Sequence, residues 1–227
     1  KGFDNTVVVV PLVNGPPTFD VTANNTGGYI YVENLDATTQ NSKWKAFIGN
    51  VSGTLTLDDV NGNTIYDWSL TTVSGEVFAT RYADIVNWTG INCAPLNATE
   101  AENNNMSHSS NQDNISATFS KTENNQQMIV GTTTINANTC RSTNVYQNST
   151  DSGAGDKWEE LVLYDRGNAS WDNNITSWGR IVYAQTMQDG LGGYNNQTPL
   201  DFQLIVPENG ADGFASSTAY YFYVELS

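Results

Sequence analysis

Ten asparagines stand in Asn-x-Ser/Thr sequons, the acceptor motif for N-linked glycans, in this chain of 227 residues. They are Asn24, Asn50, Asn87, Asn97, Asn105, Asn114, Asn148, Asn168, Asn174 and Asn196. The chain holds 29 Asn and 43 Ser plus Thr, and a random order of these residues would give about five or six such triplets. Because a glycan fits only on a solvent-facing position, the excess predicts a secreted or cell-surface glycoprotein. The alternative is that the Asn- and Thr-rich composition forms sequons by accident.

We expect at least half of the ten sequons to carry sugar. Three of the four best candidates lie in one polar stretch, residues 97–114, and the fourth lies in the similar stretch 138–156, both of which we interpret as exposed loops. Sugar is less expected on two sequons that adjoin apolar strand residues. The four best candidates are Asn97, Asn105, Asn114 and Asn148, and the two others are Asn50 and Asn87.

Cys93 and Cys140 are the only cysteines. An even count in an exported chain favours a disulfide, and closing a loop of about 47 residues would stabilise the fold by ~4 kcal/mol in the chain-entropy model. The alternative is two buried free thiols. A zinc site is disfavoured because His108 is the one histidine and has no second ligand at zinc spacing.

Few residues offer catalytic chemistry. Serine-type hydrolysis needs a general base, and His108 falls in the loop that we expect to be flexible. Glycoside hydrolysis needs two carboxyl groups in one cleft, but adjacent residues on a strand point to opposite faces, so neither Asp58/Asp59 nor Glu159/Glu160 forms a dyad. We therefore expect no enzyme, and a secreted glycoside hydrolase with unpaired carboxylates is the least favoured alternative.

No cofactor or metal is expected either. Asp59, Asn61 and Asn63 have the spacing of calcium ligands, but Leu70 stands where the bidentate Glu of an EF-hand would be. Asn61-Gly62 is instead the strongest short-range signal for a β-hairpin. The glycine-rich stretch 190–193 lacks the following helix of a phosphate-binding loop.

Net charge and hydropathy argue against some classes of binding partner. The formal net charge of -15 repels phosphate backbones and anionic lipids, which argues against nucleic acid and membrane surfaces. No stretch reaches the 18 or so apolar residues of a membrane span.

We interpret Lys1 as a processed N-terminus, as export would leave it. Two of the six tryptophans, Trp171 and Trp178, lie among sequons and favour a carbohydrate-binding protein as an alternative.

Short alternating segments separated by turn residues, without a 3.6-residue period, predict an all-β fold. We expect an immunoglobulin-like or jelly-roll-like β-sandwich of antiparallel strands with long glycosylated loops. Leu57, Tyr66 and Trp68 should share one apolar face of the hairpin. The last two strands should each bury one face. The predicted strands are residues 29–33, 44–49, 53–57, 64–70, 76–80, 116–119, 128–131, 160–164, 180–184, 201–206 and 219–226.

The N-terminal segment, residues 1–17, is set apart from the sandwich domain that we expect over residues 18–227. Its run of six apolar residues does not alternate, so both faces require burial, and Pro11 disfavours an ordinary central strand. One possibility is a first strand within its own sandwich. The other is a donor strand, residues 6–13, that completes a second copy by β-augmentation. The apolar residues are Val7, Val8, Val9, Val10, Leu12 and Val13.

Four stretches carry a resemblance to a known group. Residues 44–53, 61–68, 75–81 and 201–210 resemble exported archaeal proteins of unassigned activity. These stretches hold turn and core residues, so the resemblance implies a fold and a compartment and no catalytic residue. The chain is also similar in architecture to archaeal thread and pilus subunits that assemble by donor-strand exchange, through its apolar N-terminal segment and its sequons.

These patterns together predict a structural subunit of an extracellular, N-glycosylated filament that serves adhesion or cell contact. Its partners would be further copies of itself and covalent glycans. A type IV pilin is disfavoured, because such chains begin with a long apolar helix and this one begins with a β-rich run broken by Pro11. The main alternative is a surface-layer or carbohydrate-binding secreted β-sandwich protein.

Overall fold

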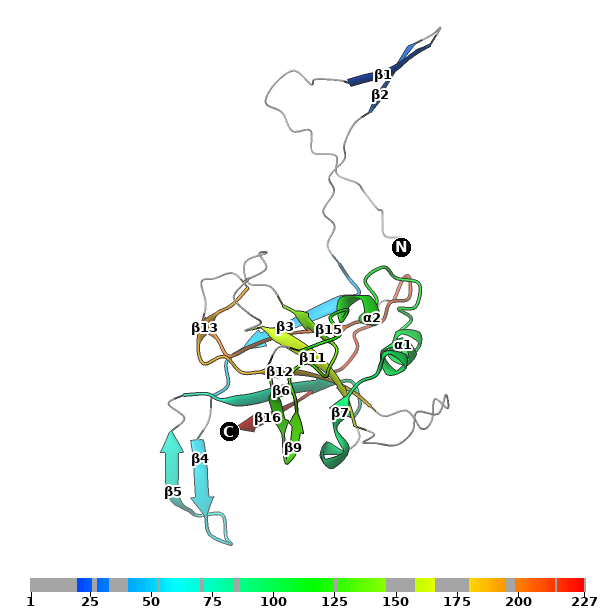
Figure 1. Ribbon diagram of the computed structural model, residues 1–227. Coiled ribbons are helices and arrows are strands. Elements are labelled where there is room, and N and C mark those ends of the chain that lie inside the picture. The colour runs from blue at the N-terminus through cyan, green and yellow to red at the C-terminus, as the bar shows by residue number, and fades with distance from the viewer. Residues whose placement is uncertain are drawn as a thin grey trace. The chain divides into compact units, whose positions relative to one another are not determined.

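The computed structural model describes residues 20–25, 28–32, 41–52, 54–69, 72–83, 86–124, 126–145, 158–165, 180–194, 199–214 and 216–226 (Figure 1). For residues 20–32 and 54–55 it describes the backbone alone. The chain divides into two compact units, Lys1–Asn41 and Ser42–Ser227. The first contains an antiparallel hairpin of β1 (Asp20–Asn25) and β2 (Gly28–Val32). The proposed domain boundary after residue 17 and the proposed donor segment lie outside the described residues.

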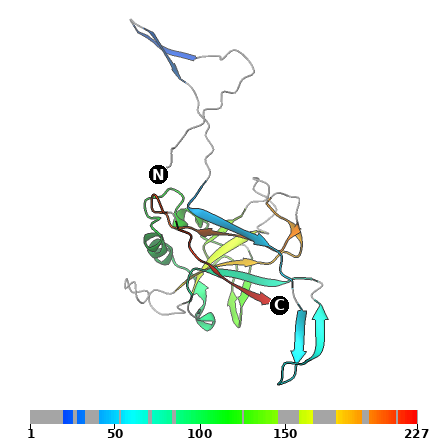
Figure 2. The same ribbon diagram turned by 180° about the vertical axis from the view of Figure 1, so that it is seen from behind.

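An antiparallel sheet forms the centre of the second unit (Figures 1 and 2). Its strand order is β10 (Ser142–Asn144), β11 (Glu159–Tyr164), β12 (Ile181–Thr186), β6 (Gly75–Thr80) and β16 (Tyr221–Leu226), and β7 (Asn92–Cys93) also pairs with β11. A second layer pairs β15 (Phe202–Pro207) with β3 (Trp44–Gly49). Three hairpins complete the strands: β4 (Thr54–Asp58) with β5 (Thr64–Ser69), β8 (Met128–Val130) with β9 (Thr133–Ile135), and β13 (Leu191–Gly192) with β14 (Pro199–Leu200).

The predicted all-β, antiparallel, sandwich-like fold is confirmed, but its central strands are buried on both faces. Every residue of β6 and β11 is buried. On β12, Tyr183 packs in the core beneath β15, while its neighbour Val182 packs in a second core that includes β8 and β9. The central sheet therefore lies between two apolar cores rather than facing solvent on one side, as strands with apolar residues at consecutive positions require.

The prediction of one exposed loop over the polar stretch 97–114 was wrong for its first half, because residues 97–105 are helical and only residues 106–114 are turns and irregular backbone. The helical half forms most of α1 (Leu96–Asn105), and the predicted strand at residues 116–119 is instead α2 (Ile115–Thr118). Ala98 and Ala101 on α1 and Ile115 on α2 are buried in or beside the core. The Asn103 Oδ1 accepts the backbone N–H of Ile115 at 2.7 Å, which joins the two helices. Tertiary burial thus outweighs the low helix propensity of this Asn-rich stretch.

The hairpin β4–β5 has the turn that the sequence predicts. Gly62 adopts a φ of 81°, in the left-handed region that glycine tolerates. The Asp59 Oδ1 accepts the N–H groups of Asn61 and Asn63, each at 2.8 Å, and the side-chain amide of Asn63 donates to Oδ2. These hydrogen bonds, first that from the Asn63 side chain, lower the pKa of Asp59. The carboxylate therefore closes the turn, in the role that the hairpin interpretation gave this segment.

Candidate functional site

Five sequon asparagines lie among residues whose side chains are described. Four are exposed and one, Asn114, is half-buried. The expectation of a loop position was wrong for Asn97 and Asn105, which are on α1. Asn114 lies in the non-helical segment before α2 and caps that helix by accepting the N–H of Ala117 at 2.8 Å. Asn24 lies on β1, and the other four sequons, at Asn148, Asn168, Asn174 and Asn196, lie outside the described residues. The exposed four are Asn50, Asn87, Asn97 and Asn105.

Two sequon hydroxyls have a structural role instead of facing solvent. Thr99, the third residue of the sequon at Asn97, is fully buried and donates to the carbonyl of Leu96 at 2.7 Å. Its hydroxyl also lies 3.1 Å from that of Ser116, the third residue of the sequon at Asn114. The packing of α1 against α2 therefore explains why hydroxyl residues stand at both positions, without reference to glycosylation.

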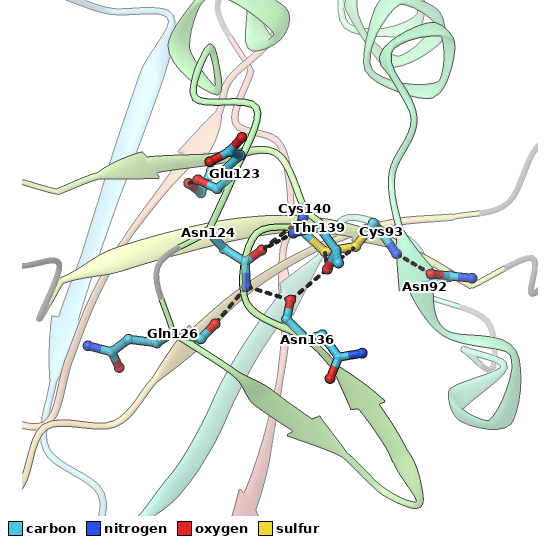
Figure 3. Close-up of a disulfide and its surroundings, with 9 residues drawn as sticks. Asn92, Cys93, Glu123, Asn124, Gln126, Asn136, Thr139 and Cys140 are labelled. Atoms are coloured by element: carbon cyan, nitrogen blue, oxygen red, sulfur yellow. Dashed lines mark hydrogen bonds between the residues drawn. A yellow bond between two sulfur atoms is a disulfide. The ribbon is translucent and has the colours of Figure 1, made fainter.

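Cys93 and Cys140 form a disulfide, with their Cα atoms 4.9 Å apart (Figure 3). Cys93 lies on β7, which pairs with β11, and Cys140 is fully buried just before β10, which pairs with the same strand. The bond joins residues 47 apart in the sequence. It therefore connects the start of the helical region to the far side of the β8–β9 hairpin.

Asn124 organises the segment that carries Cys140 (Figure 3). Its side chain is fully buried. The Oδ1 accepts the backbone N–H groups of Thr139 and Cys140 at 2.9 and 2.8 Å, and the Nδ2 donates to the carbonyls of Gln126 and Asn136 at 2.6 and 3.1 Å. Sequence patterns gave no sign of this role, because Asn124 and Asn125 look like further members of a polar loop.

Glu159 and Glu160 point to opposite faces of β11, as the strand geometry predicts. Glu159 forms an ion pair with Lys121 at 2.9 Å and accepts the hydroxyl of Ser142 at 2.8 Å. Glu160 is fully buried, and its Oε2 accepts the backbone N–H of Ile205 at 2.9 Å while its Oε1 has no hydrogen-bond partner. Burial raises the pKa of Glu160 well above its ordinary value, which favours the protonated carboxyl.

Glu159 and Glu160 do not face a common site. The two adjacent carboxyl groups face different surroundings, and Asp58 and Asp59 belong to the exposed strand end and turn of β4–β5. Among the residues that the structure describes, no three His, Cys, Asp or Glu side chains gather as a metal site would require. The described part of the chain thus offers neither of the carboxylate dyads that glycoside hydrolysis would need.

His108 is buried and not part of a flexible loop, so that expectation was wrong. Its Nε2 lies 2.6 Å from the carbonyl oxygen of Glu208, and its ring meets the ring of Trp44 edge to face at 5.9 Å. Glu208 in turn forms an ion pair with Lys45 and accepts the backbone N–H of Thr218 at 2.8 Å. This histidine therefore joins the turns after α1 to the segment after β15, and its Nδ1 has no hydrogen-bond partner.

An exposed aromatic pair lies on the hairpin β4–β5, which extends away from the layers in Figures 1 and 2. Tyr66 and Trp68 are 58% and 49% exposed, and their ring centroids lie 4.8 Å apart. Leu57 stands opposite Tyr66 and is exposed as well. The apolar face that we predicted for this hairpin therefore faces solvent. The tryptophans that we expected to be exposed, Trp171 and Trp178, lie outside the described residues.

The strand β16 forms one edge of the central sheet and is largely exposed, contrary to the expectation that it buries one face. It pairs with β6, where Gly75 has a φ of 129° and a Cβ atom would lie 2.0 Å from the carbonyl oxygen of Glu225. Any side chain at position 75 would clash with the backbone of β16, so this pairing requires glycine there. The exposed side chains on β16 are Tyr221 at 41%, Phe222 at 39%, Val224 at 47% and Leu226 at 38%.

Comparisons with protein families, with curated proteins and with solved structures find no match for this chain. Within the described residues, no helix is long and apolar enough to cross a membrane. The surface of the molecule itself is therefore the guide to its function. Its most unusual features there are the apolar edge at β16 and the aromatic face of the hairpin β4–β5.

Proposed function

We propose that this chain is a structural subunit of an extracellular, N-glycosylated filament that assembles by donation of an N-terminal strand and serves adhesion or cell contact. The observation that carries the proposal is the β16 edge, where four large apolar side chains are each more than a third exposed. An unpaired apolar edge is a site for pairing with another chain.

The surface chemistry of the chain agrees with an extracellular polymer. The net charge of -15 would keep neighbouring filaments apart and hydrated. Asn50, Asn87, Asn97 and Asn105 are exposed and accessible to an oligosaccharide. The disulfide, the ion-paired Glu159 and the buried His108 each make contacts that hold segments of the fold together.

Electron microscopy of negatively stained native material tests the proposal directly. We expect fibres from the full chain and mostly single particles after deletion of residues 1–14, with circular dichroism showing that the truncated chain retains its strands. Filaments of normal length from the truncated chain would refute strand donation. Native material that contains only separate particles at every concentration would refute the filament.

A carbohydrate-binding protein is the second candidate, and the exposed pair of Tyr66 and Trp68 favours it. Aromatic rings on protein surfaces supply an apolar face for recognition, and Tyr66 and Trp68 lie on the same face of β5. Affinity electrophoresis in gels that contain polysaccharide tests this role. Retardation that disappears in Trp68→Ala but persists in Val224→Ala would favour carbohydrate binding over assembly.

A further inference from the structure

The strand β16 lacks the devices that usually protect a sheet edge. Folded proteins prevent unwanted pairing at an edge with lysines, prolines, bulges or very short strands. β16 has the sequence YFYVEL, and its register with β6 runs over six residue pairs without a bulge. Its one charged residue, Glu225, accepts the backbone N–H of Gly131 at 2.8 Å, so this carboxylate is already engaged with the β8–β9 turn.

Other edges in the same unit are protected. At the opposite end of the central sheet, β10 has three residues and β7 has two, and Ser142 of β10 is further bridged by Lys121. In the second layer, β3 carries Lys45, whose ammonium group donates to the carbonyl of Thr218 at 3.0 Å. The β16 edge has neither of these two kinds of protection, because it is six residues long and carries no lysine.

A strand placed beside β16 would lie between the two apolar cores. Val224 stands opposite Val77, which belongs to the core beneath β15 and β3. Tyr223 stands opposite Phe78 in the other core, and its ring lies 5.1 Å from that of Trp88. Both faces of an added strand would therefore contact apolar groups. A strand that alternates apolar and polar residues would place its polar face against one of these two cores.

Residues 7–13 satisfy this unusual requirement. Val7, Val8, Val9 and Val10 place apolar side chains on both faces of an extended strand, and the segment carries no charge. Seven extended residues span about 23 Å, which is sufficient to follow the six residues of β16 at about 3.3 Å per residue. Pro11 can be accommodated because the outer side of the added strand becomes the new edge, where a missing N–H costs nothing.

We infer that the β16 edge is the acceptor site and that its occupant is residues 7–13 of a second copy of this chain, paired along β16 with side chains inserted toward both cores. This inference rests on the proposed filament and adds its contact surface. It also explains why Phe222 meets Phe47 and Phe202, at 4.9 and 6.5 Å between ring centroids, yet stays 39% exposed.

Two matched variants of the full chain test the site. Val224→Lys places a charge within the proposed strand pairing, whereas Val60→Lys places the same charge on a residue that is 101% exposed at the β4–β5 turn. Val224→Lys should raise the critical concentration for polymerisation at least about ten-fold, because the lysine would be buried at the contact. Val60→Lys should polymerise like the parent chain. Circular dichroism and thermal unfolding check that both variants are folded.

The outcomes distinguish failure of the proposed contact surface from failure of the proposed filament. If Val9→Lys prevents polymerisation while Val224→Lys does not, strand donation stands and the acceptor assignment is overturned. If the parent chain forms no polymer, the filament and its contact fail together. If both Val224→Lys and Val9→Lys raise the critical concentration, the inference is supported.

Cysteine crosslinking covers the case in which Val224→Lys fails to fold. The native cysteines are already joined to each other, so Val9→Cys with Val224→Cys introduces the free pair. A ladder of disulfide-linked multimers on a non-reducing gel, with the link mapped to these two positions, supports the inference. A link within one chain would show that the segment completes its own subunit and would overturn the donated contact, as would the absence of any link.

Discussion

Replacing Asn124 by aspartate tests how the segment around the disulfide is held. Asn124 is fully buried and uses its Oδ1 for the N–H groups of Thr139 and Cys140. Its Nδ2 donates to the carbonyls of Gln126 and Asn136 at 2.6 and 3.1 Å. Aspartate has the same shape and keeps the two accepted bonds. It loses both donated bonds and places a carboxylate oxygen against two carbonyl oxygens.

The expected loss follows from these four bonds. Two neutral hydrogen bonds contribute about 1 kcal/mol each, and a buried charge that faces acceptors adds a further penalty, so Asn124→Asp should lower the free energy of unfolding by about 3–5 kcal/mol at pH 7. Burial and the two carbonyls raise the pKa of the new carboxyl in the folded state above its unfolded value of about 3.9. The folded state then binds the extra proton, so the penalty grows as the pH rises above about 4.

Urea unfolding followed by tryptophan fluorescence, at pH 4 and pH 7 with the disulfide intact, measures this loss. The matched control is Asn136→Asp, which places the same charge on an exposed side chain in the same segment. We expect the control to change stability by no more than about 0.5 kcal/mol. The reasoning is refuted if the two variants are equally stable at pH 7, or if Asn124→Asp recovers stability as the pH rises.

Three further predictions concern the carboxylates, the disulfide and the sugars. Glu160→Gln removes a buried carboxyl with a raised pKa, so it should stabilise the protein above about pH 5 and change its stability little at pH 4. Glu159→Gln removes an ion pair and should lower the free energy of unfolding by about 1–3 kcal/mol at pH 7. Thermal unfolding at several pH values measures both effects, and equal changes in the two variants would contradict the prediction. Reduction of Cys93–Cys140 should lower the free energy of unfolding by about 4 kcal/mol, and two alkylatable thiols in the untreated native protein would disprove the bond. Glycopeptide mass spectrometry should find Asn114 the least occupied of the described sequons, because it is half-buried at a helix cap, and full occupancy there would contradict this.

Much of the strand architecture is predictable because alternation and turn chemistry are local. The segment 44–49 coincides with β3, and Asn61-Gly62 marks the hairpin because positive φ is readily adopted there. The opposed orientation of Glu159 and Glu160 follows from the two-residue period of a strand. The disulfide was favoured by the count of cysteines alone, since no other thiol competes for either partner.

The helical region and the contact surface depended on tertiary structure. Residues 97–114 have a polar, Asn-rich sequence typical of loops, yet residues 97–105 form a helix, where Ala98 and Ala101 are buried and Asn103 joins α1 to α2. The role of Asn124 likewise arises from four backbone groups brought to it by folding. Propensity is a weak local term, and contacts between distant residues outweigh it.

The position of β16 shows most clearly which features the sequence determined and which features depended on tertiary structure. By itself, the sequence determined that residues 219–226 include a strand with large side chains on both faces. It could not determine that this strand would lie at an edge, because a strand's place in a sheet depends on which distant segments pair with it. On one side of β16 lies β6, whose Phe78 pairs with Tyr223 and precedes it by 145 residues, and the described structure places no strand on the other side. Tertiary pairing therefore turned an ordinary apolar strand into an exposed surface.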